Sequence, residues 1–339
     1  MEKILIPLPH ELKENFPALL TFVEKSRSIC RHILSGKDSR KVFIVGPCSI
    51  HDRESAMHYA LRLKILAEEV ADSCILVMRV YIEKSRTAKG WKGFLYDPHL
   101  NGSNEIQTGL EWSRELFLKL AELEVPCATE FVNPLIAPYF EDLITWGFIG
   151  ARTTYSQTHR QLASSLSMPV GFKNSLDGNI KSAIHSVESA EESHTFLSTD
   201  SYGKLSAFQT LGNPDTHIVL RGSCDTTNYD AHSIEEALQL LNQYSLPQRV
   251  MIDCSHGNSQ RNATNQKNVF ENTLEQILKG NDKIFGWMIE SHLKEGNQSL
   301  NNPLEYGISI TDPCLDWKTT EELIRAAHSA LSLYPSEFT

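Results

Sequence analysis

The chain has 339 residues, of which 41% are hydrophobic and 22% are charged, and its formal net charge is -10. These values are typical of a soluble globular protein. The acidic balance argues against a general nucleic-acid-binding protein, which normally has a basic surface. No stretch of about 18 consecutive apolar residues predicts a membrane span.

The start of the chain and its cysteines bear on the compartment. The first residues lack the basic segment, long apolar run and small-residue cleavage site of a signal peptide. The seven cysteines are an odd number and contain no CxxC pair, a pattern more typical of reduced thiols than of a disulfide framework. We therefore expect a cytoplasmic protein that binds neither membranes nor nucleic acid.

Residues 1–40 form an extension ahead of the first expected strand. Within it, residues 17–36 have apolar side chains at helical spacing, and Gly36 is a typical helix stop. The apolar face of this helix must be covered. We expect it to pack on the bottom of the barrel described below or on a partner subunit.

From Lys41 onward, short apolar runs alternate with helical patterns. The runs are rich in Val and Ile and occupy residues 42–48, 75–80, 126–130, 148–152, 169–173, 217–221, 250–256 and 285–292. The helical patterns cover residues 55–70, 109–123, 134–147, 156–166, 178–190, 233–244, 266–280 and 319–331. Buried parallel strands separated by helices predict an α/β fold of the (β/α)8 TIM-barrel type over residues 41–333. We expect one domain, residues 1–339.

One segment interrupts this alternation. Residues 193–213 contain two runs of alternating character on either side of Ser201, Tyr202, Gly203 and Lys204. This pattern is typical of a β-hairpin. We predict a hairpin inserted into the barrel rather than a barrel strand.

All eight runs carry, or lead into, a residue that can bind a metal, a phosphate or a proton. Because the chemistry of such barrels lies at the C-terminal ends of the strands, this placement predicts an enzyme. The cations among these residues and in the following loop are Arg79, Lys84, Arg86, Lys92, Arg152, Lys173 and Arg221. Arginine offers a planar fork for phosphate and carboxylate, and lysine a compact charge. Solvated surface charge is the alternative for any single one, but the set predicts dianionic substrates.

A second group combines a thiol, an imidazole and two carboxylates. These residues are Cys48, His256, Glu290 and Asp312. Such donors suit one divalent transition metal, Mn, Fe, Co or Zn, better than Ca or Mg. Asp253 and His292 lie near the same strand ends and could orient the ligands. Each residue alone could instead be a buried structural one.

Lys173 allows a different chemistry. A lysine at the end of a barrel strand can form a Schiff base with a carbonyl substrate. That mechanism would leave the segments around Cys48, His256 and Glu290 without a role.

Eight segments resemble those of one enzyme family. They read GPCSIHD, MRVYIEKSRTAKGWKG, GARTTYSQTHRQLAS, PVGFKN, HIVLRG, MIDCSHGNS, ESHLKEGNQSL and YGISITDPC, in order between about residues 40 and 320. They are similar to segments of the class I (type Iα) 3-deoxy-D-arabino-heptulosonate 7-phosphate synthases, which catalyse the first committed step of the shikimate pathway. The N-terminal helix and the hairpin also fit this family.

The resemblance implies a condensation of phosphoenolpyruvate with erythrose 4-phosphate. It implies that Cys48, His256, Glu290 and Asp312 bind the metal, and that Arg79, Lys92, Arg152, Lys173 and Arg221 hold phosphoenolpyruvate. Lys84, Arg86 and Thr87 would face erythrose 4-phosphate. Lys84, Glu130 and Lys173 are the candidate catalytic residues. A homodimer or homotetramer and an aromatic amino acid effector are further implications.

The chain departs from the family pattern at several positions. Ser85 stands where the family has proline, so the loop loses a fixed φ and we expect looser positioning. Gly257 replaces an alanine, and the segments 207–217 and 222–230 are unusual. Two other functions are alternatives. One is the sister synthase that uses arabinose 5-phosphate. That enzyme typically has a Lys-Ala-Asn-Arg-Ser loop, from which residues 83–93, EKSRTAKGWKG, differ. The other is an inactive barrel with a regulatory role, which would be expected to lack a metal ligand.

Overall fold

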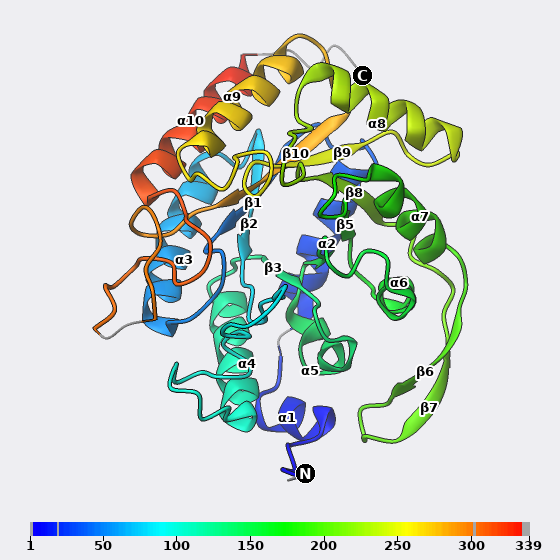
Figure 1. Ribbon diagram of the computed structural model, residues 1–339, viewed down its shortest axis with the longest axis vertical. Helices are drawn as coiled ribbons and strands as arrows, with labels where there is room; N and C mark the ends of the chain where they lie inside the picture. Colours follow the sequence, from blue (N-terminus) through cyan, green and yellow to red (C-terminus); the bar gives the residue numbers. More distant parts are fainter. Residues whose placement is uncertain (1–2, 19, 301–302, 334–339) are drawn as a thin grey trace.

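The computed structural model describes residues 3–18, 20–300 and 303–333, and its centre is a closed barrel (Figure 1). The strands are β1 (Lys41–Gly46), β2 (Cys74–Arg79), β3 (Cys127–Glu130), β4 (Trp146–Ile149), β5 (Val170–Lys173), β8 (Thr216–Leu220), β9 (Val250–Asp253) and β10 (Ile284–Glu290). They follow one another around the barrel in chain order, and β10 closes it against β1. All their pairings are parallel. The predicted (β/α)8 fold is confirmed.

Helices follow each strand and surround the barrel. They are α3 (Arg53–Glu69), α4 (Ile106–Glu122), α5 (Ala137–Phe140), α6 (Gln157–Ser165), α7 (Ile180–Glu191), α8 (Ala231–Gln243), α9 (Asn265–Leu278) and α10 (Trp317–Ser332). Several begin at a side-chain cap, as Asp52, Asp230 and Asp316 accept hydrogen bonds from backbone N–H groups of the first turn. Among the helices of the described residues, none is long and apolar enough to cross a membrane.

The N-terminal extension covers the bottom of the barrel. It consists of α1 (Pro9–Asn15), which was not predicted, and α2 (Leu20–Leu34). Cys30, Ile33 and Leu34 of α2 pack against the side chains that fill the barrel interior, such as Val42. Of the two positions that the sequence left open, the structure therefore shows the barrel bottom.

The helix expected over residues 134–147 is broken. The segment forms the short turns η1 (Pro134–Ile136), α5 and η2 (Glu141–Leu143), and its last two residues begin β4. Arg114 donates to the carbonyl of Tyr139 at 2.8 Å and Arg27 to that of Ile144 at 3.0 Å. Because these guanidinium groups satisfy the carbonyls, a continuous helix is not required.

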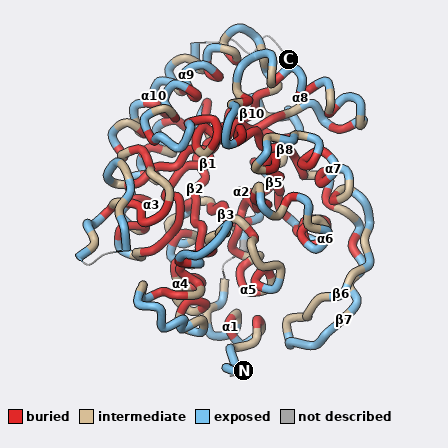
Figure 2. The backbone as a smooth tube through the Cα atoms, viewed as in Figure 1, coloured by how far each residue is buried: buried red, intermediate tan, exposed pale blue. Residues whose placement is uncertain are grey.

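The inserted hairpin is also confirmed. It pairs β6 (Thr195–Thr199) with β7 (Leu205–Gln209), antiparallel, and extends away from the barrel (Figure 1). Its strand residues are exposed or of intermediate burial, in contrast to the mostly buried residues of the barrel strands (Figure 2). The backbone N–H of His10 in α1 donates to the carbonyl of Ser201 at its tip, at 3.1 Å. The assignment of residues 1–339 to one domain stays a prediction.

A buried histidine in the barrel interior predicts that the fold is sensitive to acid. Trp146 Nε1 donates to His217 Nε2 at 3.0 Å, and the other ring nitrogen of His217 lies 3.1 Å from the carbonyl of Ile218. Burial lowers the pKa of His217 to about 4. Protonation would place a second N–H against the indole N–H. Since the folded-state pKa lies below the unfolded value, the stabilisation is complete above about pH 6.5 and is lost as the pH falls to about 4.

Between pH 7 and pH 4, we expect protonation of His217 to lower the free energy of unfolding by about 3 kcal/mol. Urea unfolding across that range should show a smaller fall in His217→Gln, whose amide oxygen can still accept from Trp146. The matched control is His232→Gln, because the side chain of His232 is 83% exposed. Equal pH dependence in wild type and His217→Gln would contradict this assignment.

Candidate active site and metal centre

A cavity of about 290 Å³ lies at the C-terminal ends of the barrel strands. Ten of the residues predicted from the sequence line it: Lys84, Arg86, Thr87, Glu130, Arg152, Lys173, Arg221, His256, Glu290 and Asp312. They come from distant parts of the chain and meet because parallel strands end on the same face. Cys48, Arg79 and Lys92 are not among the lining residues; the first two are buried and Lys92 is exposed.

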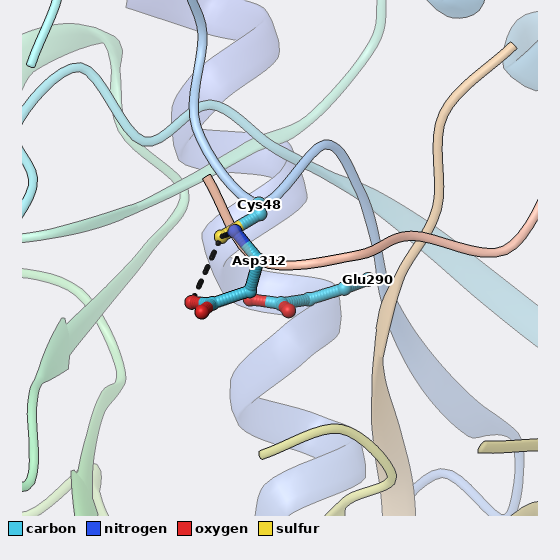
Figure 3. Close-up of side chains that lie close together, drawn as sticks. All are labelled: Cys48, Glu290 and Asp312. Atoms are coloured by element: carbon cyan, nitrogen blue, oxygen red, sulfur yellow. Dashed lines mark hydrogen bonds between the residues drawn. The ribbon is translucent and has the colours of Figure 1, made fainter. Parts of the chain in front are cut away.

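Three of the four predicted metal ligands point toward one another (Figure 3). One donor atom each of Cys48, Glu290 and Asp312 lies within 4.8 Å of the others. Cys48 follows β1, and Glu290 ends β10 beside Gly46 of β1. Asp312 lies in the loop after β10, where its backbone N–H is 3.4 Å from Cys48 Sγ and its Oδ2 is 3.3 Å away.

His256, the fourth predicted ligand, lies outside this group of three. Its Nε2 is 3.6 Å from Glu290 Oε1, so that nitrogen faces the centre. The other ring nitrogen is 2.9 Å from Asp253 Oδ2 and 2.7 Å from Ser255 Oγ. A carboxylate on the second nitrogen is the usual way to orient a metal-binding histidine. Asp253 therefore fits the predicted orienting position, whereas the role of His256 as a ligand stays a prediction.

A positive charge already lies among these donors. Lys84 Nζ is 2.8 Å from Cys48 Sγ and 2.9 Å from Asp312 Oδ2. Burial opposes the charge on Lys84, but Cys48 and Asp312 outweigh burial and raise the pKa of Lys84. Lys84 in turn lowers the pKa of Asp312, while burial, followed by Glu290, raises the pKa of Cys48. A cluster of sulfur and carboxylate donors that attracts a cation fits a divalent transition metal.

Two buried side chains hold Glu290 in place. Arg79 Nη2 donates to Glu290 Oε1 at 3.1 Å, and its guanidinium stacks 3.9 Å over the ring of Tyr81. Among the described residues, Arg79 Nη1 has no hydrogen-bond partner. Gln266 in α9 binds the backbone N–H and the carbonyl of Glu290, both at 2.9 Å. Gln266 was not predicted from the sequence, because no motif distinguishes it.

Lys173 is one partner of a buried ion pair. Its Nζ donates to Asp253 Oδ2 at 2.8 Å, and both side chains are buried. Burial opposes ionisation of Asp253, but His256 and Lys173 outweigh it and lower the pKa of Asp253 well below its usual value. A Schiff base requires a lysine amine that is free to attack a carbonyl, whereas Lys173 Nζ is bonded to the buried carboxylate of Asp253. The geometry therefore speaks against the Schiff-base alternative.

Glu83 anchors the loop that carries Lys84, Arg86 and Thr87. Its buried carboxylate accepts from the hydroxyl of Tyr96 at 2.9 Å and from the backbone N–H groups of Val132 and Asn133 at 3.0 and 3.2 Å. These bonds join the loop to the segment after Glu130. Burial raises the pKa of Glu83 to about 7. The carboxylate beside Lys84 thus acts as an anchor between two walls of the cavity.

Three buried asparagines join the strand ends on the opposite wall. Asn174 Oδ1 accepts from the N–H of Arg221 at 2.8 Å, and Asn228 Oδ1 from that of Gly222 at 2.7 Å. Asn258 donates to the carbonyl of Asp253 at 3.0 Å and accepts from the N–H of Asn228 at 2.8 Å. The network connects the ends of β5, β8 and β9, which present Lys173, Arg221 and His256.

The cavity has further polar lining residues that were not predicted as site residues from the sequence. They are Ser85, Lys89, Ser255, Ser259 and Arg261. The only feature of the sequence that could have indicated Arg261 as a site residue is its position five residues after His256. Lys92, in contrast, was predicted to bind substrate but does not line the cavity. Its backbone carbonyl accepts a hydrogen bond from the backbone N–H of Lys84 at 2.8 Å.

Comparison with known proteins places the chain in a family. Residues 16–325 match the sequence profile of the DAHP synthetase I family. The chain is 44% identical over 337 residues, 98% of this chain and 94% of the relative, to a Tyr-sensitive phospho-2-dehydro-3-deoxyheptonate aldolase from Escherichia coli (strain K12). It is 47% identical over 317 residues, 93% of this chain and 91% of the relative, to the Trp-sensitive one from the same organism.

A solved structure agrees with these sequence matches. The structure of phospho-2-dehydro-3-deoxyheptonate aldolase from Francisella tularensis SCHU S4 superposes with a TM-score of 0.97 at 42% sequence identity, covering 99% of each chain. The resemblance predicted from the eight sequence segments is therefore confirmed, and the chain is a member of the DAHP synthetase I family of enzymes.

Proposed function

We propose that this enzyme condenses phosphoenolpyruvate with D-erythrose 4-phosphate and water, giving 3-deoxy-D-arabino-heptulosonate 7-phosphate and phosphate. This is the first step of the shikimate pathway of aromatic amino acid biosynthesis. The observation that carries the proposal is the convergence, in one cavity, of cations from several strand ends with the Cys48, Glu290 and Asp312 cluster. Family membership supports the same reaction.

The cations are suited to hold the two substrates. Arg152 and Arg221 offer planar donors for the phosphate of phosphoenolpyruvate, and Lys173 and Arg79 lie deeper, where its carboxylate would enter. Arg152 Nε donates to Thr87 Oγ1 at 2.8 Å, so this arginine borders the loop that would face erythrose 4-phosphate. Arg86 belongs to the same loop and is held by the carbonyl of Trp91 at 2.8 Å. Lys92 stays a weaker candidate because it lies outside the lining.

Cys48, Glu290 and Asp312, with His256 as fourth ligand, would hold one divalent ion, Mn, Fe, Co or Zn. When bound, the ion supplies Lewis-acid polarisation of the aldehyde oxygen. A bond forms between C3 of phosphoenolpyruvate and C1 of erythrose 4-phosphate, water adds at C2, and phosphate leaves as the C2–O bond breaks. Lys84 would donate a proton near the aldehyde oxygen.

Glu130 would position or deprotonate the water. It ends β3 and lines the cavity, and Gly150 on the neighbouring strand end leaves room for its carboxylate, because a Cβ there would collide with Glu130 Oε1. The acid and the base would therefore lie on separate walls, Lys84 beside the metal cluster and Glu130 beside Gly150.

The test is phosphate release by purified protein. We expect release only with both phosphoenolpyruvate and erythrose 4-phosphate, loss after EDTA treatment, and recovery when Mn, Fe, Co or Zn is added back. Release that survives stringent metal removal would overturn the metal role. No release with either erythrose 4-phosphate or arabinose 5-phosphate, across these metals, would favour an inactive barrel.

We further propose regulation by an aromatic amino acid, because the named relatives are a Tyr-sensitive and a Trp-sensitive enzyme. Adding Phe, Tyr or Trp to the same assay would identify the effector. A homodimer or homotetramer remains part of the proposal. So does a cytoplasmic location, with which the seven free cysteines are in keeping.

A further inference from the structure

The cavity contains more unpaired positive charge than the predicted substrate contacts use. Seven lysines and arginines line it: Lys84, Arg86, Lys89, Arg152, Lys173, Arg221 and Arg261. Lys84 and Lys173 are bonded to carboxylates. Within residues 3–18, 20–300 and 303–333, none of the other five forms an ion pair. Arg261 is among these five, and neither the sequence motifs nor the comparisons give it a role.

The backbone fixes Arg261 at the rim of the cavity. The turn that follows β9 places His256, Gln260 and Arg261 in the left-handed region, with φ of 55°, 53° and 59°. The N–H of Arg261 donates to the carbonyl of His256 at 2.8 Å and closes this turn. Left-handed non-glycine residues are unfavourable, and they tend to cluster at functional sites. The turn thus presents His256 and Arg261 to the same cavity.

Arg261 lines the same cavity as two other arginines, Arg152 and Arg221. Arg221 directly follows β8 and is buried. Burial lowers its pKa; Asp253 opposes this shift, whereas the positive charges of Arg152 and Arg261 add to it. Arg152 comes from the loop after β4 and lines the same cavity. Three guanidinium groups without a bonded carboxylate repel one another, and a dianion among them would reverse that repulsion.

We propose that Arg261 is a further substrate-binding residue, which forms a three-arginine clamp with Arg152 and Arg221 around the phosphate dianion of phosphoenolpyruvate. This inference rests on the proposed function for the identity of the substrate. The clamp itself, a site for a phosphate monoester or inorganic phosphate, rests on the geometry alone. Since Arg261 is exposed, it would strengthen binding of the phosphate rather than take part in the bond changes.

The test uses the metal-loaded enzyme and the variant Arg261→Gln, which removes the charge but keeps a polar side chain. We expect the KM for phosphoenolpyruvate to rise about 10-fold or more, with kcat and the KM for erythrose 4-phosphate nearly unchanged. Arg261→Lys should recover part of the loss. Isothermal titration with phosphoenolpyruvate alone, and with inorganic phosphate, should show the same weakening. The matched control is Lys267→Ala, an exposed cation of α9 whose loss changes the net charge equally.

Four results would overturn the clamp. They are unchanged phosphate binding in Arg261→Gln, an equal effect of Lys267→Ala, an effect on erythrose 4-phosphate alone, or a fall in kcat without a change in KM. Failure of the proposed function looks different. In that case wild-type protein would bind inorganic phosphate through Arg261 but release none from phosphoenolpyruvate.

Discussion

Replacing Cys48 by alanine is expected to remove the bound metal and abolish turnover while the fold persists. The thiol is one of three donors within 4.8 Å of one another, and it is the only soft one in that cluster. Loss of a residue that merely orients a ligand typically weakens metal affinity about 10–100-fold. Loss of the ligand itself should exceed that range. Metal content after gel filtration, isothermal titration with Mn or Zn, and the phosphate-release assay measure the effect.

The matched control is Cys127→Ala. Cys127 is also a buried, free cysteine, but it lies within β3 and its thiol donates to the carbonyl of Val125 instead of belonging to the metal cluster. This variant should keep its metal and its turnover. Full activity with normal metal content in Cys48→Ala would remove Cys48 from the site. Equal losses in both variants would point to a general effect of deleting a buried thiol.

The architecture could be predicted because the barrel repeats one local rule eight times. Each strand is a short apolar run, and each helix shows apolar residues at helical spacing. A wrong prediction for one strand–helix unit therefore does not affect the prediction of the others. Apart from α1, which was not predicted, the error within the barrel occurred at residues 134–147. There the carbonyls of Ile144 and Tyr139 bind Arg27 and Arg114, which lie 117 and 25 residues away in the sequence. Such distant partners leave no periodic signal.

The site residues that lie at the ends of barrel strands could be predicted from the sequence. Lys173, Glu130 and Glu290 end their strands, and the barrel brings them to one face. Residues in loops, and residues that contact a site residue without lining the cavity, were harder to predict. The position of Lys92 depends on the path of its loop, and Gln266 acts through the backbone of Glu290. The position of Arg261 depends on a turn with left-handed backbone conformations, which the sequence of that segment does not predict.

Replacing Lys173 by methionine should lower kcat/KM on the order of 1000-fold or more, because the lysine offers a buried charge to the substrate anion. The change should also destabilise the protein. Asp253 is fully buried, and within the described part of the chain Lys173 is the only lysine or arginine that forms an ion pair with it. Breaking a buried ion pair from one side typically costs about 3–5 kcal/mol. Urea unfolding and steady-state kinetics measure the two effects separately.

The double variant Lys173→Met/Asp253→Asn separates the catalytic loss from the structural one. Asparagine removes the unpaired buried charge, so most of the lost free energy of unfolding should return. Its activity should stay below that of the single variant Asp253→Asn, which shares any change in the orientation of His256 but keeps the cation that faces the substrate. If the double variant regained turnover together with stability, Lys173 would be a structural partner of Asp253 and not a substrate-binding group. A Lys173→Met enzyme with wild-type kcat/KM would contradict the assignment outright, since it would mean that the anion is held by the arginines alone.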